Sequence, residues 1–322
     1  STLPIEKIKD QYIEFIRASL KSKWRSILVA CDIGKMVLPR LIEKKARALV
    51  LKLLDVMFDY EKKERQPYEE YKSIMDDYWL QDALKKHTTN VIALCGLEAA
   101  NIAIKKIESL ISINDSHFKN MWIPTIDDHP QNRHAGKYEC QLVHFVRDVF
   151  EQLGACQIKD TIKKLLAKDH PFFKRLAIHA INHHYMELNE LFWNWNGNPL
   201  NESSLKHELY ELLKNNCKTF SDKQIDKILD WIETKDYYIS EEIKDDEEKK
   251  NKALAYKKRE WLSALLDTKN TKIISKYDMY AKVNPAEIRH PGFDYWTETG
   301  WGGISPISEE ELCTKSNPEI AE

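Results

Sequence analysis

The stretch that decides the fold is residues 168–233, KDHPFFKRLAIHAINHHYMELNELFWNWNGNPLNESSLKHELYELLKNNCKTFSDKQIDKILDWIE. Apolar residues recur in it at intervals of three and four, which is the period of one face of an α-helix. Its first helix is expected to begin after Asp169, which can cap it, with Pro171 in the first turn. The same periodicity places Lys174 and Arg175 on the solvent side of that helix.

Three further helices follow in this stretch. Residues 187–195 are expected to form the second, which stops before Gly197, a residue suited to the backbone turn at a helix end. The third aligns leucines on one face, and the fourth opens with Ser221 and Gln224 at capping-box spacing. Each helix has one apolar stripe and therefore needs neighbouring helices to cover it.

The composition of the whole chain favours a soluble helical protein. Its 322 residues are 43% hydrophobic, and nine glycines are few for a fold rich in tight turns. A net charge of −2 gives no general attraction to nucleic acid or to an anionic membrane. No apolar run approaches the roughly 18 residues of a membrane span. The six scattered cysteines form no C-x-x-C pair, which predicts reduced thiols in a cytoplasm.

The order of elements predicts three parts: helices over residues 1–136, a helical-repeat part over 137–280, and an irregular segment over 281–322. The irregular segment, rich in Trp, Gly and Pro, is expected to pack back onto the helices through its aromatic residues. Before residue 113 every element is expected to be helical, with a single apolar helix over residues 91–113. An aromatic stripe is also expected on a helix there, at Tyr68, Tyr71, Met75, Tyr78 and Trp79.

Residues 113–136 interrupt this pattern with Asn, Asp, His, Pro and Gly. A loop of this length is either functional or disordered. Near the end of the sequence, Ser308 and Glu311 have capping-box spacing, so another helix is expected to begin there. We therefore expect the sequence to be a piece of a longer protein.

Helix after helix joined by short connections predicts an all-α fold. The pattern indicates antiparallel helix pairs stacked side by side, with a period of about 40 residues but no clear repeat in the amino-acid sequence. Such pairs are typical of irregular α-solenoids of the HEAT or armadillo kind. A compact helical bundle is the alternative architecture.

Five segments of the chain resemble the helical C-terminal regions of large bacterial anti-phage defence proteins: HPFFKRLAIH (170–179), SLKHELYELLKNN (204–216), KILDWIE (227–233), KKREWLSALL (257–266) and HPGFDYWTETGWGGISPISEEEL (290–312). Those proteins carry an N-terminal effector, often of the sirtuin or NTPase type. The resemblance implies a sensor or scaffold region that recognises a phage component or mediates assembly, with enzymatic activity elsewhere. It rests on packing residues and carries over no site residue.

One pair of histidines has a spacing found in metal sites. His179 and His183 stand one helical turn apart, as in helical zinc sites, with His170 and Glu187 as candidate third ligands. A metalloprotease motif would have Glu where Ala180 stands. We therefore expect these histidines to be surface or boundary residues, and neither a metal nor a cofactor is predicted.

The long loop offers a second set, Asp127, Asp128 and His129, with residue types suited to acid–base chemistry or binding. Polar loops often contain such residues at random, and a binding role is favoured only over a catalytic one. The chain has no complete catalytic motif and no glycine-rich phosphate loop. An enzyme is therefore the third hypothesis, and no catalytic residue is predicted.

The tryptophans give the favoured recognition surface, because exposed Trp often anchors protein interfaces. Trp193 and Trp195 end a helix, where alternation suggests that both cannot point inward, and Trp296 and Trp301 lie in the irregular segment. The predicted function is a non-catalytic scaffold that binds a protein: a phage component, or an effector domain of the same protein. The alternative is nucleic-acid binding or processing by a basic region near the start, with the residues Arg25, Arg40, Lys44, Lys45 and Arg47.

Overall fold

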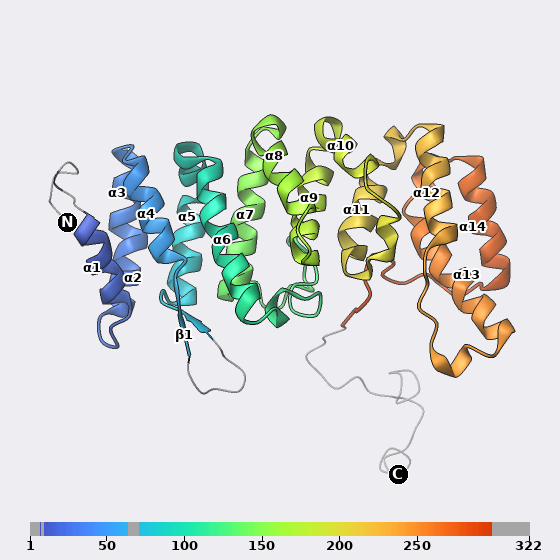
Figure 1. Ribbon diagram of the computed structural model, residues 1–322, viewed down its shortest axis with the longest axis horizontal. Coiled ribbons are helices and arrows are strands. Elements are labelled where there is room, and N and C mark those ends of the chain that lie inside the picture. The colour runs from blue at the N-terminus through green and yellow to red at the C-terminus, as the bar shows by residue number, and fades with distance from the viewer. Residues whose placement is uncertain (1–6, 8–9, 64–70, 298–322) are drawn as a thin grey trace, which may run out of the picture.

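A computed structural model describes residue 7 and residues 10–63 and 71–297 of the chain. Its helices stand side by side in one elongated row, from α1 (Asp10–Leu20) at one end to α14 (Thr271–Val283) at the other (Figure 1). The all-α prediction is confirmed for these residues. All of their buried apolar side chains except Ala255 form one continuous cluster, from Ile13 to Ile273. None of the described helices is long and apolar enough to span a membrane.

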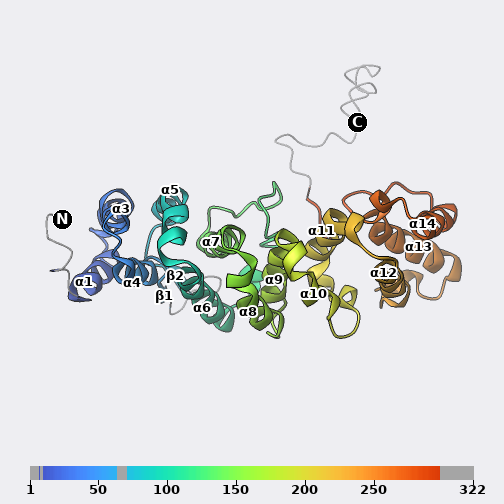
Figure 2. The ribbon, with the colours of Figure 1, turned by 90° about the horizontal axis from the view of Figure 1, so that it is seen from above.

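The first third of the row is built from short helices that pack on two longer ones. These elements are α2 (Ser26–Asp32), α3 (Leu38–Glu43), α4 (Arg47–Met57), α5 (Asp77–Cys95) and α6 (Leu97–Ile113). A π-helical turn over Ile33–Val37 joins α2 to α3, and in it Gly34 comes so close to α5 that an added Cβ would lie 3.1 Å from the Ala83 Cβ. Seen from above, α3 and α5 lie on one side of the row and α4 and α6 on the other (Figure 2).

Two predictions for this part are wrong. The residues before 113 are not all helical, because β1 (Tyr60–Lys62) pairs antiparallel with β2 (Tyr71–Ser73), and Tyr71 of the predicted helical stripe therefore lies in a strand. Met75 precedes α5, and Tyr68 falls outside the described residues. The single helix predicted over residues 91–113 is broken at Gly96, whose φ of +56° an L-residue adopts only with strain.

The middle of the row follows the predicted order more closely. It contains α7 (Tyr138–Gln152), α8 (Ala155–Leu166), α9 (Pro171–His183), α10 (Tyr185–Trp193), α11 (Lys206–Asn216) and α12 (Asp222–Thr234). The capping box of Ser221 and Gln224 at the start of α12 is confirmed. At α9 the cap is His170, not Asp169, because the His170 side chain accepts from the Phe172 backbone N–H.

The last helices are tied together by one carboxylate. Glu233, at the end of α12, accepts hydrogen bonds from Lys258 of α13 (Glu247–Ser263) at 2.6 Å and from Lys276 of α14 at 2.7 Å. Tyr280 of α14 donates to the same carboxylate at 2.7 Å. Burial alone would raise the pKa of Glu233, but these three donors outweigh it and lower the pKa to about 2.

Residues 113–136 form a structured loop over the middle of the row, seen below α6 and α7 in Figure 1. Phe118, Ile123, Thr125 and Ile126 of this loop are buried. Beyond α14, Phe293 of the described part of the irregular segment contacts the ring of His207 in α11 at a centroid distance of 4.4 Å. Residues 298–322, with Trp301 and the predicted capping box, lie outside the described residues.

Candidate functional site

The candidate residues Asp127, Asp128 and His129 are held in place by a buried turn within the loop. Asn132 accepts from the Thr125 backbone N–H at 3.2 Å. Its side-chain amide donates in return to the backbone carbonyls of Thr125 at 3.1 Å and Asp127 at 2.7 Å. Because Thr125 and Asn132 are buried, these bonds fix the backbone of the three candidate residues.

Beneath this turn lies a buried ion pair. Arg175 of α9 is 1% exposed and pairs with Glu208 of α11 through two hydrogen bonds of 2.9 Å. Its remaining N–H groups donate to the loop, at Asn120 Oδ1 and at the carbonyls of Ile123 and Pro124. The expectation that Arg175 faces solvent is therefore wrong. A prediction from helical periodicity places charged residues on the exposed face. A guanidinium can nevertheless be buried when all of its N–H groups donate hydrogen bonds.

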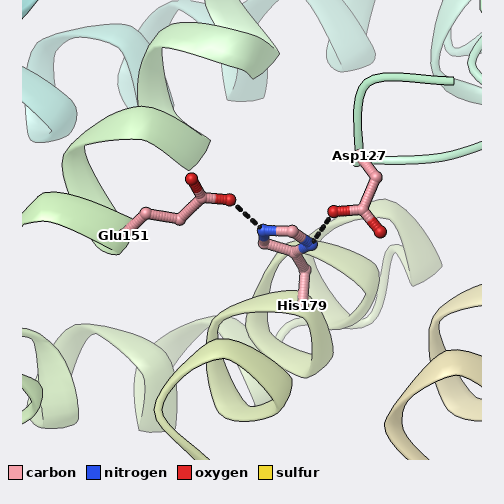
Figure 3. Close-up of side chains that lie close together, drawn as sticks. All are labelled: Asp127, Glu151 and His179. Atoms are coloured by element: carbon pink, nitrogen blue, oxygen red, sulfur yellow. Dashed lines mark hydrogen bonds and ion pairs between the residues drawn. The ribbon is translucent and has the colours of Figure 1, made fainter. Parts of the chain in front are cut away.

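His179 lies between two carboxylates that are far from each other in the sequence, Asp127 and Glu151 (Figure 3). Nδ1 of His179, in α9, is 3.2 Å from Asp127 Oδ1, and its Nε2 is 2.8 Å from Glu151 Oε1, at the end of α7. The hydrogen bond and charge of His179 lower the pKa of Glu151. His179 is 6% exposed, so the prediction that it is a surface or boundary residue is wrong. His183, one turn later, is exposed as expected.

Asp128 and His129 turn to other partners. Asp128 accepts from Arg147 of α7 at 2.7 Å, a hydrogen bond that lowers the pKa of Asp128. His129 contacts the terminal segment instead, with ring-centroid distances of 5.0 Å to Phe293 and 5.8 Å to Trp296. Three consecutive loop residues therefore contact α9, α7 and the terminal segment in turn.

Two further loop residues strengthen the contact with the terminal segment. Gln131 and Arg133 both donate to the carbonyl of Thr297, at 3.0 and 2.9 Å. Trp296 stacks on His290 within the same segment, with an interplanar angle of 5°. The structure therefore brings together two predicted binding regions, the loop and the aromatic terminal segment.

The other predicted tryptophans, Trp193 and Trp195, are both partly buried against the core. The Trp193 indole donates to the Tyr185 hydroxyl at 2.8 Å and stacks on Trp231 of α12. The argument that both cannot point inward is wrong, because α10 ends at Trp193 and the helical period no longer sets the direction of Trp195. Neither side chain is a freely exposed anchor.

Two of the predicted basic residues near the start are paired with carboxylates. Arg47 pairs with Glu98 at 3.1 Å, and Lys44 lies 3.7 Å from Glu43. Arg25 and Lys45 are exposed, and Arg40 is half-buried. The basic charge of this region is thus partly compensated by carboxylates.

A groove that the sequence did not reveal lies between the loop and the last helices. Its volume is about 1200 Å³, and three exposed apolar side chains line it: Met121 (78% exposed), Tyr238 (76%) and Tyr295 (65%). They come from three segments, and no local sequence pattern connects them.

Lysines add positive charge to this groove. Lys206 lies 3.3 Å from both Glu260 and Asp294, whereas Lys235 and Lys257 donate to the backbone carbonyls of Leu200 and Tyr238. Burial lowers the pKa of Lys235. Among the described residues, Lys235 and Lys257 form no ion pair, so they can bind a carboxylate from outside.

The arrangement around His179 does not support nucleophilic catalysis. In the part of the chain that the structure describes, both ring nitrogens of His179 face carboxylates and neither faces a hydroxyl or thiol. A nucleophile activated by histidine needs that contact. The arrangement of His179 between Asp127 and Glu151 is instead suited to ion pairing or to binding a cation.

No protein-family model matches the chain, and no curated protein or solved structure is significantly similar to it. Its function is therefore inferred from its own geometry.

Proposed function

We propose that this chain is a non-catalytic recognition module, an irregular α-solenoid of the HEAT or armadillo kind that binds a partner protein in a bacterial cytoplasm. The single row of helices supports this architecture, because helices that pack mainly on their neighbours leave long surfaces open for binding. The resemblance to helical regions of anti-phage defence proteins supports a partner that is a phage component or an effector domain of the same protein.

The observation that carries the proposal is the groove. Exposed Met and Tyr side chains are typical of protein interfaces, and Met121, Tyr238 and Tyr295 gather in one concave surface. Lys235 and Lys257 lie among them. The matching ligand is an extended segment of a protein that carries apolar side chains and at least one carboxylate.

The experiment is a pull-down with the tagged chain from phage-infected and uninfected bacterial lysates, at two salt concentrations. A bound protein is identified and purified, and its affinity is measured for the wild type, Tyr238→Ala and Tyr295→Ala. Met186→Ala is the matched control, because Met186 is equally exposed on α10 but outside the groove. We expect each tyrosine variant to weaken binding by about 2 kcal/mol, roughly 30-fold, and the control to leave it unchanged.

A second candidate function, nucleic-acid binding, is favoured by one observation. Trp24 is 85% exposed between the exposed Lys23 and Arg25, and such an aromatic can stack on a base beside phosphate contacts. This function replaces the first if three results are obtained together: only nucleic acid is recovered, its binding falls steeply as the salt concentration rises, and Trp24→Ala abolishes that binding.

A further inference from the structure

One cluster in the described chain brings together three side chains that can ligate a metal ion. Asp127 comes from the loop, Glu151 from the end of α7 and His179 from the middle of α9. One ligand atom from each lies within 4.8 Å of the other two. Figure 3 shows the two carboxylates reaching the imidazole ring from separate elements. The cluster is therefore a product of the fold.

We propose that Asp127, Glu151 and His179 bind a divalent transition-metal cation, with Zn²⁺ as the reference ion. A set of one imidazole nitrogen and two carboxylate oxygens suits Zn²⁺ and its neighbours in the first transition row. The site is independent of the proposed function, since none of its three ligands lines the groove.

The spacing of the ligand atoms is close to what such an ion requires. Bonds of about 2.0–2.2 Å to a tetrahedral Zn²⁺ place ligand atoms roughly 3.4 Å apart. His179 Nε2 and Glu151 Oε1 are already 2.8 Å apart, and the upper limit of 4.8 Å on the separations exceeds the required spacing by only about 1.4 Å. His179 is buried and fixed, whereas the Asp127 and Glu151 side chains are 46% and 30% exposed and can rotate toward it.

His183 is placed to be a fourth ligand. It follows His179 by one turn on the same helix, the spacing of paired histidine ligands in helical zinc sites. Its ring nitrogens are not among the ligand atoms that lie within 4.8 Å of one another, so its side chain has to rotate to reach the ion. Because His183 is exposed, its side chain can turn toward an ion without disturbing the core.

The competing interpretation is a metal-free ion pair, in which a protonated His179 donates hydrogen bonds to both carboxylates. Arg147 opposes a bound metal cation, because its Nε lies 4.0 Å from Glu151 and already supplies positive charge there. That charge is shared with Asp128 at 2.7 Å and Asp148 at 2.8 Å, which leaves Glu151 as the most distant of its three carboxylate partners. The two interpretations differ in one measurable property, which is saturable binding of a metal ion.

The test titrates Zn²⁺ into the full chain after removal of any histidine tag and of bound metal by a chelator. Affinity is measured by competition with a chromophoric chelator, and Co²⁺ provides an absorption spectrum that reports ligand geometry. We expect one saturable site. Asp127→Asn and Glu151→Gln should each weaken binding at least about 10-fold. The matched control is Asp128→Asn, the neighbouring carboxylate that pairs with Arg147.

His183→Ala tests the fourth ligand, and an affinity equal to that of the wild type would remove His183 from the site. The proposal as a whole is overturned if the wild type shows no saturable binding up to millimolar Zn²⁺. It is equally overturned if Asp127→Asn and Asp128→Asn behave alike. His179 variants are avoided, because an empty space at this buried position can unfold the chain regardless of metal.

Discussion

The pair of Arg175 and Glu208 should control whether the loop over residues 113–136 stays closed. All five N–H donors of the Arg175 guanidinium are used: two by Glu208, and three by Asn120, Ile123 and Pro124. Glu208 also accepts from the backbone N–H of Ile126 in the same loop. Glu208→Gln would therefore leave a buried guanidinium without its counter-charge.

Breaking a buried pair from one side costs about 3–5 kcal/mol, because the remaining charge is neither solvated nor paired. If this cost falls on the loop, opening becomes more frequent by roughly 10²- to 10⁴-fold. Amide hydrogen exchange of a peptide covering residues 119–127, measured by mass spectrometry, should show that loss of protection. A peptide from α14 serves as internal control and should keep its protection.

A double variant, Arg175→Met with Glu208→Leu, should be less harmful than either single change, because it removes both charges together. The exposed pair of Lys218 and Asp267 provides the matched comparison, and Lys218→Ala should change stability by less than about 0.5 kcal/mol. The reasoning is refuted if Glu208→Gln lowers loop protection less than 10-fold. A uniform loss of protection in the loop and in α14 would also refute it.

The pH dependence of this pair follows from the pKa of Glu208. Burial alone would raise that pKa, but the charge and hydrogen bonds of Arg175 outweigh burial and lower it. A lowered folded-state pKa gives stability that is present above the ordinary glutamate pKa and lost as the pH falls through the folded value. Loop protection should therefore be retained at neutral pH and decrease in acid.

Other parts of the chain give three further predictions. Glu233→Gln should lower the melting temperature at pH 7, because it weakens the contacts among α12, α13 and α14. The difference in melting temperature between this variant and the wild type should disappear as the pH falls from about 4.5 to about 2. A difference that stays constant over this pH range would contradict the prediction. Gly96→Ala should destabilise by about 1–3 kcal/mol through backbone strain alone, since no atom lies within 4 Å of the added Cβ, and urea unfolding measures the loss. Among the cysteines of the described residues, the exposed Cys156 should react fastest with a thiol reagent, and Cys156→Ser should remove one equivalent of fast-reacting thiol. Burial raises the pKa of Cys95 to about 11 and of Cys140 to about 12, so both should react only after denaturation; fast labelling of either in the native protein would be inconsistent with the fold.

The sequence predicted the helices well where a local pattern determines them. The Ser221 cap and the stop near Gly197 depend on residues next to each other in the chain, and the structure contains both. Arg175 was misplaced because its burial depends on Glu208 and on the loop, which lie 33 and about 52 residues away. A period of 3.6 residues contains no information about such partners.

The candidate site shows the same limit. Asp127, Asp128 and His129 could be selected from the loop by residue type, but their partners lie on α7, α9 and the terminal segment. Glu151 was overlooked because a single glutamate at a helix end carries no distinctive pattern. The lining of the groove was missed for the same reason, since Met121, Tyr238 and Tyr295 are separated by more than fifty residues each.

The long contact between the loop and the terminal segment bears on how the protein unfolds. Helices in a row exchange stabilising contacts mainly with their immediate neighbours, and such arrays can unravel from either end in separate steps. The hydrogen bonds from Gln131 and Arg133 to Thr297 join positions 166 and 164 residues apart. These two hydrogen bonds and the Arg175–Glu208 pair connect the loop in the middle of the row to α11 and to the segment that follows α14. The part of the molecule from the loop to the terminal segment should therefore lose its structure as one cooperative unit, whereas α1, which packs on α2 and α4 at the opposite end of the row, should unravel first.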